Sequence, residues 1–307
     1  MSNYPRVIPE SEVRQHLDLQ QLMQEMRAAL ISLSMGEVTQ PLRGVLAISE
    51  HRAWFGFMPA VYRDVIGTKL VTVFPQNAQL GLDTHQASIQ LFDRSTGTPL
   101  AIVDGKTITA WRTAAVSALA TDALAATDAR VLAILGSGVQ ARTHWKMLSL
   151  VRKFDAVRVW SRTEANARNF AEEIGATSMS AERAVDGADV IVTVTHAEEA
   201  VLKGQWIKAG AHINAVGAVG LQARELDDLA MRQSTVIVEC REAAMKESGD
   251  IVHSGVPIYA EVGEILAGDR VRPSARNTVY KSLGVAVEDV AAARMIFRAV
   301  SGLQIAP

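Results

Sequence analysis

The sequence predicts an α/β protein of two domains, one of them built on a parallel sheet. The chain has 307 residues, and 49% of them are apolar, so it is long enough to bury two cores. After Asp128, short apolar runs alternate with helical patterns, which is typical of a parallel sheet covered on both faces. Before Asp128, strand-like runs follow one another directly, which predicts an antiparallel or mixed sheet.

The N-terminal part of the chain begins with a helical pattern. Apolar residues recur at spacings of three and four over residues 10–35, which predicts one amphipathic helix. Clusters of Gly, Pro and polar residues then separate a series of apolar runs, which predicts strands joined by turns. These predicted strands cover residues 42–49, 53–61, 65–74, 87–93 and 99–105. The Ala-rich stretch 108–126 predicts a long helix after them.

The second part of the chain alternates between strand and helix patterns. VLAIL (131–135) leads into the helical pattern VQARTHWKMLSLV, and VRVW leads into TEANARNFAEEI. Further apolar runs of strand length follow in DVIVTVT, HINAVG, STVIVEC and residues 277–284. The last helical pattern covers residues 285–302, and we expect the helix at about 290–307 to pack back on the first domain.

Two glycines stand where the VLAIL strand ends and the next helix begins. The stretch Gly136-Ser137-Gly138-Val139-Gln140-Ala141 matches the pattern G-x-G-x-x-[GA]. In this motif the first Gly permits a tight turn and the second lets a pyrophosphate approach the backbone. The N-terminus of the helix offers free N–H groups to the phosphates. The pattern predicts a Rossmann domain, over residues 116–289, that binds a dinucleotide; the alternative is a plain Gly-rich turn.

The end of the second strand indicates which dinucleotide is bound. Ser161, Arg162 and Thr163 follow VRVW, where NAD-specific sites have an Asp or Glu that binds the ribose hydroxyls. A cation with two hydroxyl groups suits the 2′-phosphate of NADPH instead. We therefore expect NADPH as the cofactor. If Arg162 is only a solvated surface charge, NADH is the alternative.

Composition excludes several classes of partner. The net charge of −2 and the pI near 6.4 argue against a nucleic-acid-binding surface. The sequence has neither a run of 18 apolar residues nor a signal-peptide pattern, so we expect no membrane partner. A single cysteine, Cys240, excludes an internal disulfide and fits a cytoplasmic protein. The seven histidines lack the spacing of metal sites, so no metal is expected.

Several segments together resemble the ornithine cyclodeaminase/mu-crystallin family. The resemblance covers about residues 40–295 and rests on FMPAVYRDVIGTKLVTVFPQN, GLDTHQASIQLFDRSTGTPLAIVDGKTITAWRTAAVSALAT, VLAILGSGVQA, HINAVGAVGLQARELDD and VYKSLGVAVEDVAAA. It implies an α+β substrate-binding and dimerisation domain, over residues 1–115, beside the Rossmann domain. It also implies a homodimer that acts on small amino or imino acids. Activities in the family include ornithine cyclodeamination, alanine dehydrogenation and reduction of cyclic ketimines.

Three isolated cations are candidates for holding the substrate carboxylate. Arg43 lies in QPLRGV, Lys69 in IGTKLV and Arg112 in TAWRTAA, all in apolar surroundings. A buried anion needs cationic partners, and a guanidinium can grip a carboxylate with two hydrogen bonds. The resemblance implies that these positions hold the carboxylate or polarise its nitrogen. An ion pair at the surface or between domains is the alternative for each.

The resemblance adds further candidates near the predicted site. Thr84 and His85 precede a strand. The candidates for the proton donor of the reaction are His85, Lys69 and water, and the alternative for His85 is a purely structural role. The remaining candidates end strands at the cofactor edge or match a segment that closes over the nicotinamide ring. They are Thr193, Val194, Thr195, Val216, Gly217, Ser282 and Gly284.

One departure from the family pattern bears on the reaction. Members that cyclise ornithine have an Asp shortly after INAVG, where this sequence has Val219. Valine cannot exchange a proton or pair with an ammonium group. Asp227 and Asp228 lie further on, in RELDD, where starting a helix is the simpler role. Reduction of an imine needs less from the protein, because a protonated iminium is already an electrophile.

The sequence therefore predicts an NADPH-dependent reductase of a small α-imino acid, such as pyrroline-2-carboxylate or piperideine-2-carboxylate. The cofactor would transfer hydride to the C=N carbon. One alternative is an ornithine cyclodeaminase or an NAD-dependent amino-acid dehydrogenase. A second is a non-catalytic protein of this fold that binds NADPH.

Overall fold

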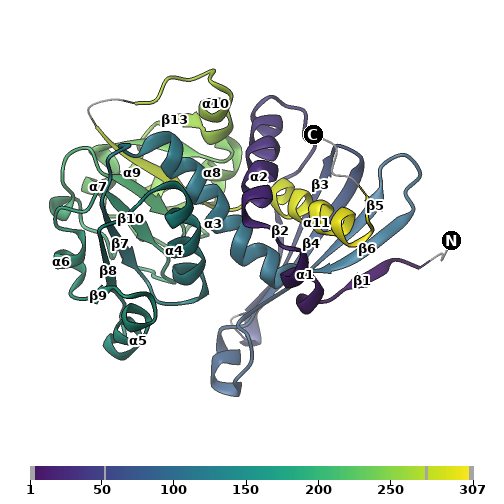
Figure 1. Ribbon diagram of the computed structural model, residues 1–307, viewed down its shortest axis with the longest axis horizontal. Helices are drawn as coiled ribbons and strands as arrows, with labels where there is room; N and C mark the ends of the chain where they lie inside the picture. The colour runs from purple at the N-terminus through teal and green to yellow at the C-terminus, as the bar shows by residue number, and fades with distance from the viewer. Residues whose placement is uncertain (1–3, 52, 274–275, 304–307) are drawn as a thin grey trace. The chain divides into compact units, whose positions relative to one another are not determined.

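The computed structural model describes residues 4–51, 53–273 and 276–303. The chain divides into two compact units. The mixed-sheet unit comprises the residues up to Arg112 together with those from Gly284 onward, and the parallel-sheet unit is Thr113–Leu283 (Figure 1). Residues 1–3 of the predicted first domain and residues 304–307 of the helix expected at 290–307 lie outside the described residues.

The mixed-sheet unit is built on six strands in the order β1-β6-β5-β4-β3-β2. Strand β1 pairs parallel with β6, and the other neighbours are antiparallel, so the sheet is mixed. The strands are β1 Arg6–Ile8, β2 Gly44–Ile48, β3 Ala53–Tyr62, β4 Val65–Val73, β5 His85–Asp93 and β6 Pro99–Asp104. The short 3-10 helices η1 Ser49–His51 and η2 Pro75–Leu80 join them.

Three helices complete the mixed-sheet unit: α1 Glu10–His16, α2 Leu19–Ser34 and α11 Ala286–Val300. The prediction of one helix over residues 10–35 is wrong, because the chain is extended between α1 and α2. The Asp18 side chain accepts a hydrogen bond from the Gln21 N–H and so starts a second helix. Helix α11, yellow in Figure 1, packs against α2, β3 and β4 although it comes from the C-terminal end of the chain.

The two faces of the mixed sheet differ in burial because side chains alternate along each strand. A Cβ added at Gly67 on β4 would lie 2.8 Å from Val290 of α11, so this face of β4 meets the helix. Lys69 and Val71 share that face and are buried. On the opposite face, Leu70 is partly exposed, and Phe57 next to it on β3 is 41% exposed.

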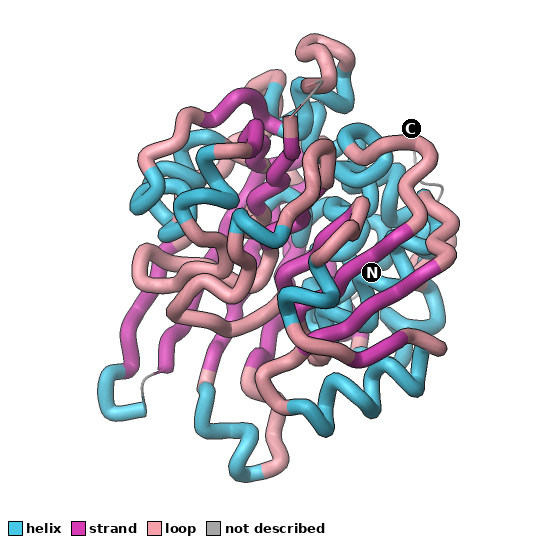
Figure 2. Tube along the Cα trace, turned by 90° about the vertical axis from the view of Figure 1, so that its left-hand side faces the viewer, coloured by secondary structure: helices cyan, strands magenta, loops and turns pink. Residues whose placement is uncertain are grey.

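The parallel-sheet unit has eight strands in the order β13-β12-β14-β11-β10-β7-β8-β9, all parallel to their neighbours (Figure 2). Every residue of β10 and β11 is buried, as a sheet covered on both faces requires. The predicted α/β class with a Rossmann-type sheet is confirmed. The strands are β7 Val131–Leu135, β8 Ala156–Trp160, β9 Thr177–Ser178, β10 Val190–Thr193, β11 His212–Ala215, β12 Ser234–Val238, β13 Ile258–Glu261 and β14 Asn277–Lys281.

The helices of the parallel-sheet unit lie between its strands in the sequence. They are α4 Val139–Val151, α5 Glu164–Ile174, α6 Ala181–Val185, α7 Asp228–Arg232, α8 Arg241–Glu247, α9 Gly249–Ser254, α10 Val262–Ala267 and the 3-10 helix η3 Gly204–Trp206. Helix α3, Gly105–Leu124, is shared, because it begins in the mixed-sheet unit and continues past Arg112 into the parallel-sheet unit. In the described part of the chain, no helix has the length and apolarity needed to span a bilayer.

Candidate active site

The glycine turn between β7 and α4 has the geometry of a phosphate-binding loop. Gly136 has φ +137°, and a Cβ there would lie 2.7 Å from the carbonyl oxygen of Val194, so only glycine fits without strain. At Gly138, the residue before α4, a Cβ would meet nothing within 4 Å, so the space beside the backbone is open. A phosphate can therefore approach the backbone at the N-terminus of this 13-residue helix. Val139, in the first turn, is 65% exposed.

The end of β8 lies beside this turn. The Ser137 hydroxyl donates a hydrogen bond to the Ser161 hydroxyl oxygen at 2.9 Å, which joins the turn to the segment after β8. Arg162 and Thr163 follow and are exposed. Gln140, in the first turn of α4, accepts a hydrogen bond from the ring of His144 through its carbonyl oxygen. Arg142 of α4 donates from Nη1 to the carbonyl oxygen of Ser137 at 2.6 Å, so the structure places a cation and two hydroxyl groups at the glycine turn.

The candidates at the ends of β10 and β11 are held by a carboxylate that sequence reasoning missed. Thr193 and Thr195 donate their hydroxyl groups to the Glu225 carboxylate at 2.8 and 2.7 Å. The N–H of Gly217, which follows Val216 after β11, donates to the same carboxylate at 2.7 Å. Glu225 is fully buried. Its position in RELDD offered no local signal, because its partners are separated from it by loops.

The segment after β14 is divided between two sets of contacts. The Ser282 hydroxyl and the Leu283 N–H each donate to the carboxylate of Glu239 at 2.8 Å, within the parallel-sheet unit. Gly284 belongs to the mixed-sheet unit, and its carbonyl oxygen accepts a hydrogen bond from Arg43 at 2.7 Å. Its φ is +73°, and a Cβ there would lie 2.6 Å from Nη1 of Arg112. Gly284, predicted to bind the cofactor, therefore borders the predicted carboxylate-binding cations.

The three predicted cations lie in one cluster with two carboxylates of α11. Nζ of Lys69 on β4 is 2.6 Å from Oδ2 of Asp289. Arg112 on α3 donates from Nε to Oδ1 of Asp289 at 3.0 Å and from Nη1 to Oε2 of Glu288 at 2.6 Å. All four side chains are buried. A ligand could use the same two nitrogens of Arg112 only by displacing Glu288 and Asp289.

Oppositely charged side chains meet in this cluster. Arg43, Lys69 and Arg112 bring three positive charges, whereas Glu288 and Asp289 bring two negative ones. Burial alone would raise the pKa of Asp289, but Arg112 and Lys69 hold that pKa below its usual range. Burial lowers the pKa of Lys69 to about 8, although Asp289 opposes the shift. Lys69 and Asp289 are therefore both charged near neutral pH, and the three cations favour a small anion at this cluster.

His85 and Thr84 have different surroundings. His85 begins β5, on the same face of the sheet as Lys69. Burial, together with the charge of Lys69, lowers the pKa of His85 to about 4. The ring is therefore neutral near pH 7 and brings no imidazolium proton to the site. Thr84 is exposed in the connection before β5, and its carbonyl oxygen accepts a hydrogen bond from the Phe74 N–H.

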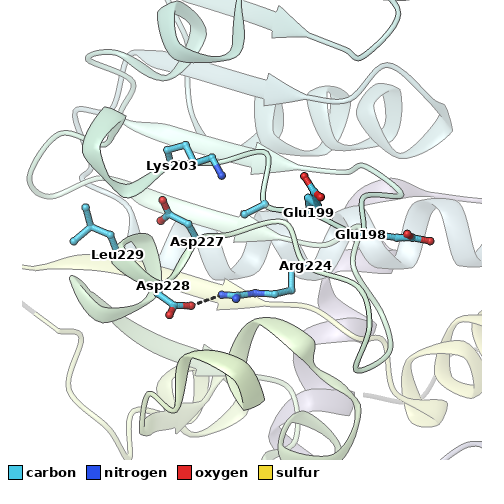
Figure 3. A pocket seen from close by; sticks show the side chains of 8 residues that line it. Glu198, Glu199, Lys203, Arg224, Asp227, Asp228 and Leu229 are labelled. Atoms are coloured by element: carbon cyan, nitrogen blue, oxygen red, sulfur yellow. Dashed lines mark hydrogen bonds and ion pairs between the residues drawn. The ribbon is translucent and has the colours of Figure 1, made fainter.

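The loop that carries Val219 contains no carboxylate available to replace the missing Asp. Val219 is 41% exposed, and Glu225 is buried in its own contacts. Asp227 accepts a hydrogen bond from the Ala230 N–H at 2.8 Å and caps α7, so its predicted helix-start role is confirmed. Asp228 pairs with Arg224 at 2.7 Å in the hollow of Figure 3.

The hollow in Figure 3 lies in the parallel-sheet unit and mixes acidic and basic side chains. Its lining residues are Glu198, Glu199, Ala200, Lys203, Arg224, Asp227, Asp228 and Leu229, which include none of the predicted site residues. Within the described residues, no three His, Cys, Asp or Glu side chains are arranged to hold a metal ion.

Known proteins match this chain along nearly its whole length. Residues 5–303 match the profile of the ornithine cyclodeaminase/mu-crystallin family. The ketimine reductase mu-crystallin of Mus musculus is 45% identical over 306 residues, covering 97% of this chain and 98% of the mouse protein.

Two solved structures have the same fold. One is the Δ1-pyrroline-2-carboxylate reductase of Thermococcus litoralis in complex with NADH and L-proline. Its TM-score is 0.92 and its sequence identity is 33%. The match covers 98% of this chain and 100% of the Thermococcus chain. The other is an archaeal alanine dehydrogenase dimer with bound NAD. It has a TM-score of 0.92 and 28% identity and covers 97% and 96% of the two chains.

The pKa of Lys69 predicts how anion binding depends on pH. A carboxylate binds to the charged ammonium, so affinity should be constant below about pH 8. Above that pH it should fall about tenfold per pH unit as Lys69 loses its proton. Titration with pyrrole-2-carboxylate, a stable small carboxylate, from pH 6.5 to 9.5 measures the effect. Lys69→Met should bind more weakly and lose the dependence, whereas a flat wild-type profile would contradict the assignment.

Proposed function

Because the chain belongs to the ornithine cyclodeaminase/mu-crystallin family, we propose that it is an NADPH-dependent reductase of small α-imino acids. The proposed substrates are cyclic ketimines, pyrroline-2-carboxylate or piperideine-2-carboxylate. The observation that carries this proposal is the cluster in which the buried Lys69 and Arg112 and the partly buried Arg43 lie with Glu288 and Asp289. The names of the relatives, a ketimine reductase and a pyrroline-2-carboxylate reductase, support the same reaction.

The cluster would bind the carboxylate of the substrate. A cyclic imino acid of this class is an anion at its carboxyl group, which the three cations attract. Lys69 is the most direct partner, because its ammonium group has three donors and one of them faces Asp289. Arg112 contributes mainly its charge, since its Nε and Nη1 already donate to Asp289 and Glu288. This grip fixes the orientation of the C=N bond relative to the carboxylate.

The parallel-sheet unit would hold the cofactor. Gly136, Gly138 and the N-terminus of α4 suit the pyrophosphate, because a side chain at Gly136 would strike Val194 and the space at Gly138 is open. Ser161, Arg162 and Thr163 would hold the 2′-phosphate. NADPH, when bound, supplies the hydride for the C=N carbon.

The protein needs to supply little acid–base chemistry. Hydride addition to the iminium carbon moves the π electrons to nitrogen, which keeps its proton and becomes an amine. His85, with a pKa of about 4, is uncharged at neutral pH and is not required as an acid. Val219 in place of a carboxylate favours this simple reduction over ornithine cyclodeamination, which must also handle a primary amine and release ammonia.

The proposed assembly is a homodimer in the cytoplasm. The face of the mixed sheet opposite α11 carries Phe57, Leu70 and Ile102, which are partly or largely exposed. An apolar sheet face of this kind suits burial against a second copy. One archaeal relative is described as a dimer. The free thiol of Cys240 and the expected lack of disulfides fit a reducing compartment.

The test of function is turnover of an imino-acid panel with NADPH, followed by loss of nicotinamide absorbance. Pyrroline-2-carboxylate and piperideine-2-carboxylate should be reduced. The matched control is 1-pyrroline, which lacks the carboxylate. Its kcat/KM should be lower by about 100-fold or more, because two charge-assisted hydrogen bonds are worth about 1.5–3 kcal/mol each.

Other outcomes of this panel contradict the proposal. Formation of proline and ammonia from ornithine with NAD⁺ would identify a cyclodeaminase. Binding of NADPH without turnover of any imino acid would identify a non-catalytic binding protein.

The cofactor preference depends on Arg162. Replacement by alanine removes the charge proposed to pair with the 2′-phosphate. Arg162→Ala should lower kcat/KM for NADPH by about 10- to 100-fold, the value of one charge-assisted contact. The same variant assayed with NADH is the control, and its rate should stay within about twofold of wild type. Equal losses of kcat/KM with NADPH and NADH would contradict the proposed role of Arg162.

The homodimer makes a prediction for the open face of the mixed sheet. Leu70→Lys places a charge on that face and should give monomers in light scattering or sedimentation, because an unpaired charge at an apolar interface is costly. Gln24→Lys, on the exposed side of α2 in the same unit, is the matched control and should remain dimeric. A wild-type monomer, or an unaffected Leu70→Lys dimer, would rule out this interface.

A further inference from the structure

A buried carboxylate that the proposed chemistry does not use connects the ends of two neighbouring strands. Oε1 of Glu225 accepts hydrogen bonds from the N–H of Thr195 at 2.6 Å and from its hydroxyl group at 2.7 Å. Oε2 accepts from the Thr193 hydroxyl at 2.8 Å and from the N–H groups of Gly217 and Ala218 at 2.7 and 3.3 Å. One carboxylate thus binds the segments after β10 and after β11.

The backbone of this region is also tied to a buried ion pair. Oδ1 of Asp250 accepts the N–H groups of Glu225 and Leu226, each at 3.0 Å. Asp250 pairs with Lys281 at the end of β14, at 3.1 Å, and both are fully buried. Nζ of Lys281 donates to the carbonyl oxygen of Ala218 at 2.6 Å. Contacts therefore run in a closed ring from Glu225 through Ala218, Lys281 and Asp250 back to Glu225.

The ring lies at the edge of the sheet where such folds bind ligands. Strands β10, β11 and β14 are adjacent in the sheet, and their carboxyl ends meet at this edge. In open parallel sheets, ligands bind in the crevice outside the carboxyl ends of the strands. The two strand ends are in direct contact, since a Cβ at Gly217 would lie 2.0 Å from the carbonyl oxygen of Thr195. Their relative position is therefore strictly defined.

The hydrogen bonds of Glu225 suit an ionised carboxylate, which accepts but does not donate. Burial raises the pKa of Glu225, while Lys281 and the N–H of Thr195 oppose that shift. A glutamine at this position would have nearly the same shape. Its NH₂ group, however, would face an N–H donor whichever way it turned, so one strand end would lose its acceptor.

We propose that Glu225 is a positioning residue for the cofactor. It fixes the backbone after β10 and β11 in the geometry that receives the nicotinamide half of NADPH, without itself being the ligand contact. This inference rests on the proposed function, because it takes the carboxyl edge of the sheet as the cofactor site. Its specific content is that cofactor affinity depends on a side chain that acts through Thr195 and Gly217.

Asp189 provides a matched control in the same unit. Its carboxylate also accepts two backbone N–H groups, those of Arg130 and Val131, at 2.7 and 2.8 Å. Asp189 precedes β10, so it lies at the amino end of the sheet, opposite the proposed cofactor edge. Asp189→Asn therefore repeats the chemical change of Glu225→Gln away from the site.

The experiment measures NADPH affinity by fluorescence, together with the melting temperature, for the wild type and both variants. We expect both variants to melt earlier. Glu225→Gln should raise the Kd for NADPH at least tenfold, and Asp189→Asn should leave it within about twofold. Glu225→Asp, which keeps the charge but is shorter, should give an intermediate Kd and remains informative if the glutamine variant does not fold.

Three results would overturn the inference. Unchanged Kd values in both Glu225 variants would show that the carboxylate is not needed for cofactor geometry. An equal loss of NADPH affinity in Asp189→Asn would show that Glu225 acts only through the general stability of the unit. If the wild type binds no nicotinamide nucleotide at all, the proposed function fails, and the role of Glu225 fails with it.

Discussion

The contact between helix α11 and the cations of the mixed-sheet unit is the interaction on which the proposed anion site depends. Lys69 and Arg112 are buried, and burying charge without a partner is costly. Asp289 touches both, and Glu288 touches Arg112. Removing one partner from a buried ion pair typically costs about 3–5 kcal/mol. The two carboxylates lie in the first turn of α11, where the helix dipole also favours negative charge.

The parallel-sheet unit uses buried carboxylates in a related way, although there they bind backbone N–H groups and hydroxyl groups. Glu225 joins the ends of β10 and β11, and Glu239 binds Ser282 and Leu283 after β14. These contacts satisfy donors that the strands leave at their carboxyl ends. Because each acceptor comes from a different segment, the loops at the proposed cofactor edge are linked to one another. Both units thus hold their proposed ligand-binding segments with acids that are distant in sequence.

Much of the fold follows from local patterns. VLAIL and the helix from Val139 to Val151 were predicted at their observed positions, because a strand, a glycine turn and an amphipathic helix each have a distinct signature. Strand β1 and the helices α6, α8, α9 and α10 were missed, since three to seven residues are too few to establish a period. The break before Asp18 was missed because the apolar spacing continues through it.

The site was predictable to a smaller extent. Arg43, Lys69 and Arg112 were identified with help from the family resemblance, and the structure brings them together. Glu288 and Asp289 were not identified, because their partners are more than 170 positions away in the sequence and no local pattern records such contacts.

The order of the units along the chain has a consequence for biosynthesis. Strand β4 with Lys69 leaves the ribosome early, whereas α11 emerges only after the whole parallel-sheet unit. Until then the nascent chain has the basic half of the cluster and lacks the acidic half. Domains that are contiguous in sequence can fold as they emerge, but the mixed-sheet unit is incomplete until α11 has been synthesised. The parallel-sheet unit is thus synthesised before the proposed anion site can form.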